Sequence, residues 1–495
     1  MIEPCQLNDI QQSDLEDWDQ LRSLGHRMVD DIIEDLRTLR DKPVWQPVPE
    51  HVRKHLASSL PRDPIGPEAA YEEFKLYVSP YPRGNAHPRF WGWVNGSGLP
   101  FGIFADLLAA AMNPSVGAFE NAATLVEEQV LDWLKEMLSF PRTTSAVLTS
   151  GCSMSNIIGL AVARTSRAKV DVRSAGVAGI PKEMVLYASS ETHSSVRKAV
   201  ELLGHGRNAL RTIRVDHQFR IDVAAMRARI LADRLDGYEP FCVVANVGTV
   251  NTGAIDNLAQ VADLCREQNL WLHIDGAFGT LAWLCEELRP ALKGLQRADS
   301  LAFDLHKWMY LPYDVGCVFI RDADAHREAF VGTPTYLSRT AAGPASHLNS
   351  FADCGIELTR RFRALKVWMT LKAYGVNAFA RRIRENIKQA DYLSKLVDAH
   401  PCLQLVVPAT LNVVCFRYVT PDLSPEELDR LNEELLIKLQ LSGTALPSHT
   451  IINDRFVIRV AITNHRSEYS DFDSLVESVV RIGQSTDLTL SQYCK

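Results

Sequence analysis

The stretch Trp271-Leu272-His273-Ile274-Asp275-Gly276-Ala277, followed by Asp304-Leu305-His306-Lys307-Trp308, decides the fold prediction for this chain. A short apolar run leads into Asp275, which predicts a buried strand that ends on a carboxylate. In parallel sheets, ligands bind at the carboxyl ends of the strands. We therefore expect Asp275 to lie where a ligand binds.

Further short runs rich in β-branched residues alternate with helix-length segments before and after this stretch. The predicted strands are 146–148, 184–187, 241–245, 271–274 and 315–320. Strands that are apolar on both faces and separated by helices predict an α/β fold, with a mostly parallel sheet covered by helices.

The two ends of the chain have different patterns. Apolar residues recur at helical spacing from Trp18 to Leu36, and prolines are frequent after Asp41. Near the C-terminus, strand patterns at 403–407, 413–416 and 456–460 accompany helical patterns at 381–397 and 421–439. We expect an N-terminal helical arm and linker (1–90), a large domain with the ligand site (91–375) and a small α+β domain (376–495).

Composition narrows the class of protein. The chain has 495 residues and a formal net charge of −7, which disfavours binding to nucleic acid or to an anionic membrane. Its ten cysteines include no C-x-x-C pair, which argues against a zinc ribbon or a disulfide framework and suits a reducing compartment. No stretch has the pattern of a signal peptide or a membrane span, so we expect a cytoplasmic protein without a metal site.

Lys307 and Asp275 together point to one cofactor. A lysine that forms a Schiff base and a carboxylate that holds a pyridinium nitrogen are the two groups that pyridoxal phosphate needs. At ~4 Å and an effective dielectric constant near 20, an opposite charge contributes roughly 4 kcal/mol, which keeps the ring nitrogen protonated.

Three further features of the sequence suit this cofactor. His193 follows the predicted strand 184–187, where its imidazole can stack on one face of a flat ring, while Ala277 offers a small side chain to the other face. The turn Gly151-Cys152-Ser153 opens a helix, where N–H groups can approach a phosphate. Each residue also has a structural interpretation when taken alone, so the prediction depends on the whole set.

In this order, the Gly/Ser turn, His193, Thr249, Asp275 and Lys307 resemble the pyridoxal-phosphate-dependent decarboxylases of the aromatic-amino-acid and glutamate decarboxylase group. The resemblance covers nearly the whole chain. The matching segments include 87–90, 130–134, 192–195, 271–277, 304–308, 334–337 and 360–366. It implies the aspartate-aminotransferase fold (fold type I) with a seven-stranded sheet, an amino-acid substrate and a homodimer.

The resemblance also implies roles for single residues around the cofactor. Lys307 corresponds to the Schiff-base lysine, Asp275 to the partner of the ring nitrogen and His193 to the stacked histidine. The other cofactor-binding residues implied are Ser153 and Met154 near the phosphate, Thr249 on the polar edge, Ala277, His306 beside the Schiff base, and Asp304 on the phosphate side. As an anion, Asp304 needs a cation or N–H donors there.

Tyr336 corresponds to a tyrosine on a catalytic loop that closes over the neighbouring subunit's site, where its phenol protonates the α-carbon. Trp91 and Trp93 match an aromatic patch on the substrate side, which favours aromatic amino acids, although both are equally interpreted as core residues. The segment 94–98 departs from the animal aromatic decarboxylases, at the expected contact to the substrate carboxylate.

The sequence leaves three alternatives open. The enzyme can act on another amino acid, such as glutamate or aspartate. It can also be a decarboxylating aldehyde synthase, an activity associated with loss of the loop tyrosine, which this chain keeps as Tyr336. In a different class, it can be a non-catalytic protein that binds pyridoxal phosphate.

Overall fold

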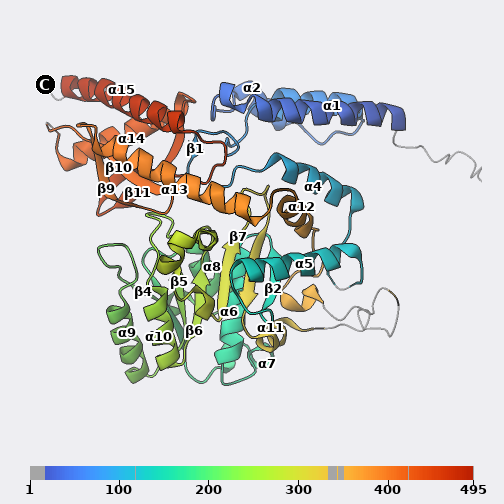
Figure 1. Cartoon of the computed structure of the whole chain (residues 1–495), viewed down its shortest axis with the longest axis vertical. Coiled ribbons are helices and arrows are strands. Elements are labelled where there is room, and N and C mark those ends of the chain that lie inside the picture. Colours follow the sequence, from blue (N-terminus) through green and yellow to red (C-terminus); the bar gives the residue numbers. More distant parts are fainter. Residues whose placement is uncertain (1–16, 118, 333–342, 344–349, 422, 494–495) are drawn as a thin grey trace, which may run out of the picture. The chain divides into compact units, whose positions relative to one another are not determined.

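The computed structural model describes residues 17–117, 119–332, 343, 350–421 and 423–493. The chain divides into two compact units, Met1–Gly84 and Asn85–Lys495 (Figure 1). The domain boundaries predicted after residues 90 and 375 stay predictions.

The first unit is a set of helices held together by polar contacts. Its α-helices are α1 (Trp18–Arg37), α2 (Glu50–Leu56) and α3 (Gly66–Glu73). α1 begins after Asp17, whose side chain accepts hydrogen bonds from the N–H groups of Asp19 and Gln20. Within α1 only Leu24 is buried, and Arg27 forms an ion pair with Glu68 of α3.

The second unit contains a seven-stranded sheet in the order β2-β8-β7-β6-β5-β3-β4. The strands are β2 (Ser145–Thr149), β3 (Met184–Ser189), β4 (Leu210–Ile213), β5 (Glu239–Asn246), β6 (Trp271–Asp275), β7 (Ser300–Asp304) and β8 (Gly316–Ile320). β8 is antiparallel to both its neighbours, and every other pair is parallel. The predicted mostly parallel sheet is confirmed.

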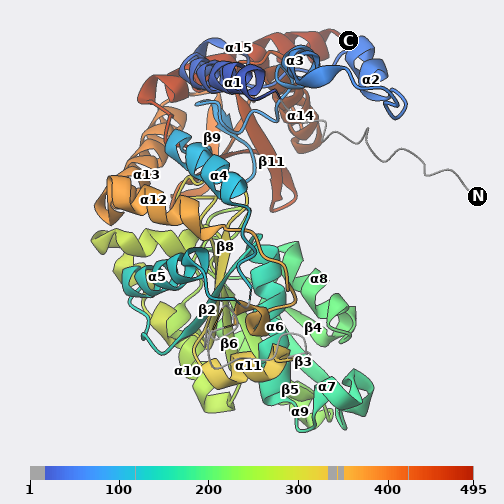
Figure 2. The same ribbon diagram turned by 90° about the vertical axis from the view of Figure 1, so that its right-hand side faces the viewer.

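Helices cover this sheet on both faces. The α-helices between residues 100 and 374 are α4 (Pro100–Met112), α5 (Ala122–Met137), α6 (Cys152–Arg167), α7 (Val172–Ala175), α8 (Ser194–Leu202), α9 (Val223–Leu235), α10 (Leu258–Gln268), α11 (Ala323–Phe330) and α12 (Ala364–Tyr374), and of these α5, α6, α9 and α10 pack directly on its strands. α6 packs across β5 to β8, and Figure 2 shows α6 and α8 on one side of the sheet with α10 on the other. None of the helices in the described ranges is both long and apolar enough to span a membrane.

The same unit carries a second sheet, in the order β1-β11-β12-β10-β9. Its strands are β1 (Phe90–Trp91), β9 (Leu403–Thr410), β10 (Val413–Tyr418), β11 (Leu446–Ile452) and β12 (Arg455–Ala461). Three helices pack on it, α13 (Val376–Asp398), α14 (Pro425–Leu441) and α15 (Tyr469–Tyr493). The C-terminal strands and helices predicted from the sequence thus form a smaller α+β layer with its own apolar core.

A buried ion pair holds the larger sheet to the segment before α12. Arg360 Nη2 lies 2.5 Å from Glu127 Oε1 of α5, and both side chains are buried. The guanidinium also donates to the carbonyl oxygens of Val116 and Leu148. Burial raises the pKa of Glu127, and the charge of Arg360 opposes this shift. Arg360 is thus the partner that offsets part of the cost of burying this carboxyl group.

Replacing Arg360 with methionine is expected to lower the free energy of unfolding by about 3–5 kcal/mol, because Glu127 is left buried without its cation. Denaturant titration followed by circular dichroism measures this change. The double variant Arg360→Met/Glu127→Leu should recover part of the loss, since neither charge remains. Equal stability of the single and double variants would contradict this account.

Candidate active site

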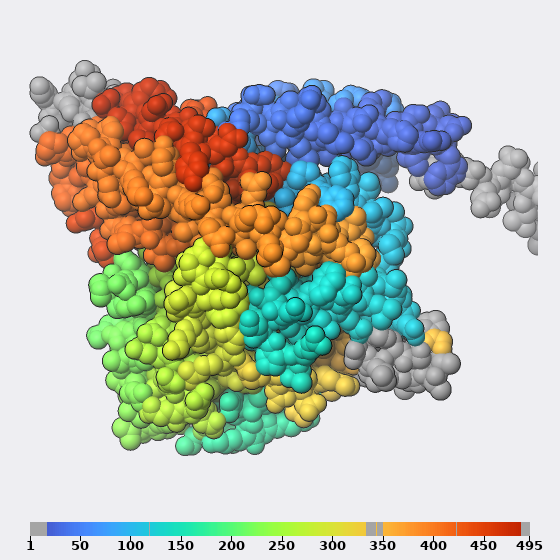
Figure 3. Space-filling model, in the orientation of Figure 1, coloured from blue at the N-terminus to red at the C-terminus, as the bar shows by residue number. Residues whose placement is uncertain are grey.

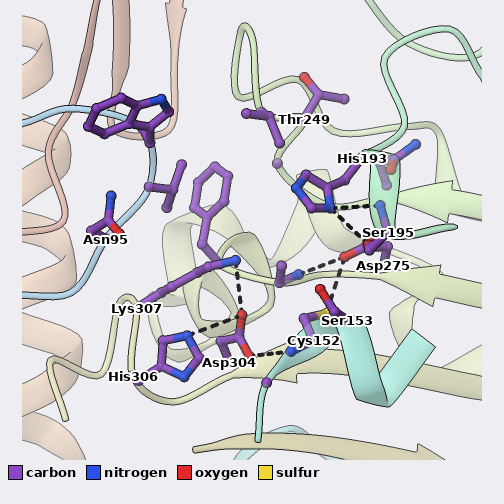
Figure 4. A pocket seen from close by; sticks show the side chains of 18 of the residues that line it. Asn95, Cys152, Ser153, His193, Ser195, Thr249, Asp275, Asp304, His306 and Lys307 are labelled. Atoms are coloured by element: carbon purple, nitrogen blue, oxygen red, sulfur yellow. Dashed lines mark hydrogen bonds and ion pairs between the residues drawn. The ribbon is translucent and has the colours of Figure 1, made fainter. Parts of the chain in front are cut away.

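One cavity opens where the strands of the larger sheet end (Figure 4). Its volume is about 420 Å³, and its wall includes the segments that follow β2, β3, β5, β6 and β7. Most of the site residues predicted from the sequence line it, namely Trp93, Ser153, Met154, His193, Thr249, Asp275, Ala277, Asp304, His306 and Lys307. The fold thus brings together residues from distant parts of the chain.

Lys307 follows β7 and forms an ion pair inside this cavity. Its Nζ lies 2.9 Å from Asp304 Oδ2, and Asp304 Oδ1 accepts a hydrogen bond from Cys152 N at 2.7 Å. Burial lowers the pKa of Lys307, but the charges of Asp304, Cys152 and Asp275 and the hydrogen bond to Asp304 together outweigh burial and raise this pKa above its usual value. The lysine is therefore an ammonium, and Asp304 has both the cation and the N–H donor that a buried carboxylate needs.

Asp275 is the last residue of β6 and is buried at the cavity wall. Its Oδ2 accepts a hydrogen bond from Asn156 Nδ2 at 2.9 Å. Its Oδ1 accepts from Ala277 N at 3.2 Å and from Cys152 Sγ at 3.4 Å. All three donors are neutral, so the carboxylate keeps its charge available for a cationic group in the cavity.

His193 is the N-cap residue of α8. Its Nδ1 accepts a hydrogen bond from Ser195 N at 3.2 Å and lies 2.8 Å from Ser195 Oγ. Partial desolvation in the cavity lowers the pKa of His193. The ring is therefore neutral at physiological pH, with its other edge directed away from α8.

The first turn of α6 supplies backbone N–H groups to the cavity. Gly151 precedes the helix with φ at 150°, a value that favours glycine. A Cβ atom built on Gly151 would lie 3.3 Å from His306 Cε1, and one on Gly316 would lie 2.6 Å from Gly151 Cα. Ser153 and Met154 follow in this turn, where the positive end of the helix dipole attracts anions.

Three aromatic residues contribute to the wall of the cavity. Trp93, Phe278 and Tyr313 line the cavity, and the Trp93 side chain is 49% exposed. The structure does not bring Trp91 to the cavity. Trp91 is buried in the core of the smaller sheet, where its ring stacks on Phe472.

Thr249 and Tyr336 are two further residues that were predicted for the site. The Thr249 hydroxyl is held in its own loop, since Oγ1 accepts a hydrogen bond from Ala254 N at 3.0 Å and lies 3.0 Å from Thr252 Oγ1. Tyr336 lies outside the described residues.

Comparison with known proteins assigns the chain to a family. The model of the pyridoxal-dependent decarboxylase conserved domain matches residues 49–419. The chain belongs to this decarboxylase family. The predicted decarboxylase resemblance, the enzyme class and the cofactor, pyridoxal 5′-phosphate, are therefore confirmed, and the protein is an amino-acid decarboxylase, a carboxy-lyase.

Several characterised proteins resemble this decarboxylase over most of its length. It is 34% identical over 475 residues to the aromatic-L-amino-acid decarboxylase of Bacillus atrophaeus, which covers 95% of this chain and 97% of that protein. It is 30% identical over 458 residues to the phenylacetaldehyde synthase of Arabidopsis thaliana, covering 90% of this chain and 92% of that protein. The histidine decarboxylase of Mus musculus is 28% identical over 518 residues, covering 100% of this chain and 73% of that protein.

A solved structure extends this similarity to the fold. The crystal structure of Oryza sativa TDC with PLP and tryptamine superposes with a TM-score of 0.88 at 28% identity, covering 98% of this chain and 99% of that one. The predicted fold of pyridoxal-phosphate decarboxylases is thereby confirmed.

The chemistry of the cavity fits pyridoxal 5′-phosphate. The cofactor presents an aldehyde, a basic ring nitrogen, a flat ring and a phosphate dianion. One cavity of this decarboxylase holds a primary amine (Lys307), a carboxylate with neutral partners (Asp275), an imidazole (His193) and a helix N-terminus with a glycine at its start (Gly151). Each group of the cofactor thus has a chemically matched partner.

Several cavity residues of this decarboxylase were not predicted from the sequence. They include Glu191, Asn246, Phe278 and Tyr313 in the wall, and Asn156 behind Asp275. Asn156 has no distinctive signal, because it follows the polar Ser155 directly before the apolar part of the helix. Glu191, Phe278 and Tyr313 lie in loops, where a single sequence gives no clear pattern, whereas Asn246 is the last residue of β5.

Proposed function

We propose that this decarboxylase converts aromatic L-amino acids into amines and carbon dioxide. The observation that carries the proposal is the aromatic wall of Trp93, Phe278 and Tyr313 in the same cavity as Lys307. Flat apolar side chains favour a flat apolar substrate, because both lose water when they stack. The name of the Bacillus atrophaeus relative supports the same substrate class.

We further propose roles for the residues around the cofactor. Lys307 holds it covalently through Nζ, Asp275 faces the ring nitrogen, and His193 and Ala277 lie on opposite ring faces. Ser153 and Met154, in the first turn of α6, bind the phosphate, with Asp304 behind them and Thr249 and His306 at the polar edges. The dipole of α6 and the ion pair of Lys307 with Asp304 support these assignments.

When bound, pyridoxal phosphate supplies an electron sink for the bond that breaks at the substrate α-carbon. The residues of the chain control which bond of the substrate gives its electrons to the cofactor. Asp275 stabilises positive charge in the cavity through its ionised carboxylate. Lys307 Nζ must lose its proton before it can act as a nucleophile, and the ion pair with Asp304 Oδ2, 2.9 Å away, opposes that loss.

The remaining residues orient the substrate and exclude water. The aromatic wall fixes the side chain of the substrate, so that the bond to the carboxylate can stand perpendicular to the ring plane. His193 is neutral and can donate through Nε2 to a polar group in the cavity. From sequence alone, we assign the final protonation of the α-carbon to the phenol of Tyr336.

An amino-acid panel tests the proposal. The purified enzyme is loaded with cofactor and incubated with the common amino acids, dihydroxyphenylalanine and hydroxytryptophan, while carbon dioxide is measured and the organic product is identified. Amines from aromatic substrates are expected. Turnover of histidine, glutamate or aspartate alone would overturn the substrate class, and an aldehyde with hydrogen peroxide would make the enzyme an aldehyde synthase, as named for the Arabidopsis relative.

We also propose that the enzyme is a homodimer that forms through α4. Leu107, Leu108 and Met112 of this helix are 57%, 49% and 56% exposed, although apolar side chains at neighbouring positions are usually covered. α4 and α5 both pack on α12 and reach the surface shown in Figure 3. Leu125 of α5 is a further exposed leucine.

Replacing Leu108 with glutamate is expected to weaken this dimer at least tenfold, about 1.4 kcal/mol, because a charge would be buried at an apolar contact. Sedimentation equilibrium measures the dissociation constant. Leu235→Glu is the matched control, since Leu235 of α9 is also an exposed leucine but lies away from α4. An unchanged dimer in the Leu108 variant would place the interface elsewhere.

A further inference from the structure

A chain of buried hydrogen bonds leads away from the cavity behind Asp275. Asn156 Nδ2 donates to Asp275 Oδ2, and Asn156 Oδ1 lies 2.9 Å from His273 Nε2. His273 Nδ1 lies 2.8 Å from Ser300 Oγ, which accepts a hydrogen bond from Trp271 Nε1 at 2.7 Å. All five side chains are buried, and only Asp275 lines the cavity.

The two ends of this chain fix the direction of every hydrogen bond in it. Trp271 Nε1 can only donate, and the carboxylate of Asp275 can only accept. Ser300 therefore donates to His273 Nδ1, and His273 donates through Nε2 to Asn156 Oδ1. Burial lowers the pKa of His273 to about 4, so the ring carries a single proton. The amide nitrogen of Asn156 is thus directed toward the cavity.

Asn156 also reaches His193. Its Nδ2 donates a second hydrogen bond to Ser195 Oγ at 3.0 Å, and Ser195 Oγ lies 2.8 Å from His193 Nδ1. Because Ser195 N also donates to Nδ1, this ring nitrogen is an acceptor, and the proton of the neutral imidazole is on Nε2. One amide group therefore contacts Asp275 directly and His193 through Ser195.

The imidazole of His273 is closely packed against α6, so it cannot turn into another orientation. α6 crosses His273 at Gly159, where a Cβ atom would lie 2.7 Å from both Cε1 and Nδ1 of the imidazole. The ring is also held on both nitrogens, by Asn156 and by Ser300. Its position is thus set by close packing as well as by hydrogen bonds.

We propose that Asn156 is a positioning residue that sets the hydrogen-bonding state of both cofactor-facing groups. It holds Asp275 as an ionised acceptor and His193 as the Nε2–H tautomer, while His273, Ser300 and Trp271 fix the orientation of its amide. This inference rests on the proposed roles of Asp275 and His193 toward the cofactor. It assigns a function to side chains that do not touch the cavity.

The variant Asn156→Asp separates this role from packing. The new carboxyl has the shape of the amide and still accepts from His273, but once ionised it can no longer donate to Asp275 or Ser195. The titratable groups around it are Asp275 and His273 on β6, His193 at the start of α8 and Cys152 on α6. Asp304 and Lys307 also act on Cys152 and His193 through their charges.

The experiment measures the dissociation constant of pyridoxal phosphate and the visible absorbance of the bound cofactor at about pH 6 and about pH 8. In Asn156→Asp, the dissociation constant should rise about tenfold to a hundredfold at the higher pH, because a hydrogen bond to a charged group is replaced by repulsion. At the lower pH the carboxyl binds a proton and donates again, so the loss should be smaller. Asn156→Leu should weaken binding equally at both pH values.

Two further variants complete the test. Ser300→Ala removes the hydroxyl between His273 and Trp271 and should weaken cofactor binding about twofold to tenfold, the effect of a neutral hydrogen bond. Asn432→Leu is the matched control, because Asn432 of α14 is also buried and bonds to the backbone of Tyr418. It should lower the melting temperature and leave the dissociation constant unchanged.

Wild-type affinity in Asn156→Asp at both pH values would overturn the inference. A loss that is equal in the aspartate and leucine variants and independent of pH would also overturn it, because it would indicate packing alone. Failure of the wild-type protein to bind pyridoxal phosphate would instead refute the site assignment under the proposed function. The two failures are therefore distinguishable.

Discussion

Lys307→Ala is expected to abolish the borohydride-reducible adduct with pyridoxal phosphate and to lower decarboxylation at least about a thousandfold, as loss of a covalent catalytic group does. In the described part of the chain, Lys307 is the one lysine that lines the cavity. Reduction with borohydride, digestion and mass spectrometry identify the modified peptide. Carbon dioxide release from an aromatic substrate measures the rate.

Lys307→Arg is the control for loss of charge. A guanidinium keeps a cation beside Asp304, which otherwise has only the Cys152 N–H and a more distant His306 as partners. It does not form the covalent adduct, because a guanidinium stays protonated at neutral pH. The arginine variant should therefore fold with near-normal stability and still lack the adduct. An adduct in either variant would show that a different lysine holds the cofactor.

The sequence predicted five of the seven strands of the larger sheet, each a run of mostly apolar residues, and missed β4 and β7. β5 and β6 were found in this way, because both are buried on two faces. β4 was missed since it is an edge strand of four residues, in which Arg211 and Thr212 are polar. β11 was missed because Pro447, Ser448 and His449 interrupt its apolar pattern, although pairing with β12 places it firmly in the smaller sheet. In both β4 and β11, pairing with a neighbouring strand, and not the local sequence pattern, sets the strand conformation.

Much of the site was predictable where a polar residue lies at the end of a strand or in the loop after it. Asp275 and His193 have such positions, so the topology alone carries them to one edge of the sheet. Trp91 and Trp93 are two positions apart, so in a continuous strand both side chains would lie on the same face. The strand ends at Trp91, and Trp93 has φ at 52°, so the second indole turns into the cavity while the first stays in the core. A left-handed backbone at tryptophan has no signal in a single sequence.

The hydrogen-bonded residues behind Asp275 could not be predicted from the sequence. Asn156 and His273 come from a helix and a strand separated by more than one crossover, and only the packing of α6 on β6 brings them together. Asp304 illustrates the opposite case. Its need for a cation and an N–H donor followed from burial alone, and Lys307 and Cys152 supply them.

Asp275→Asn is expected to lower kcat/KM about a thousandfold while the covalent adduct at Lys307 survives. At ~4 Å and an effective dielectric constant near 20, the carboxylate contributes roughly 4 kcal/mol to a positive ring nitrogen, or about 3 pKa units. An amide removes this support, so the nitrogen loses its proton near neutral pH and the ring withdraws electrons less strongly. The kinetic loss and the intact adduct are measured on the same preparation.

The contrast with Asp275→Glu separates charge from shape, because glutamate keeps the carboxylate but moves it by one methylene group. It should retain more activity than the isosteric asparagine, even though asparagine fits the space between Asn156 and Ala277 better. A cofactor analogue methylated at the ring nitrogen carries a permanent charge and should restore part of the activity of the asparagine variant. If that variant keeps more than about a tenth of the wild-type rate, Asp275 does not face the ring nitrogen, and the electron sink is controlled by another group.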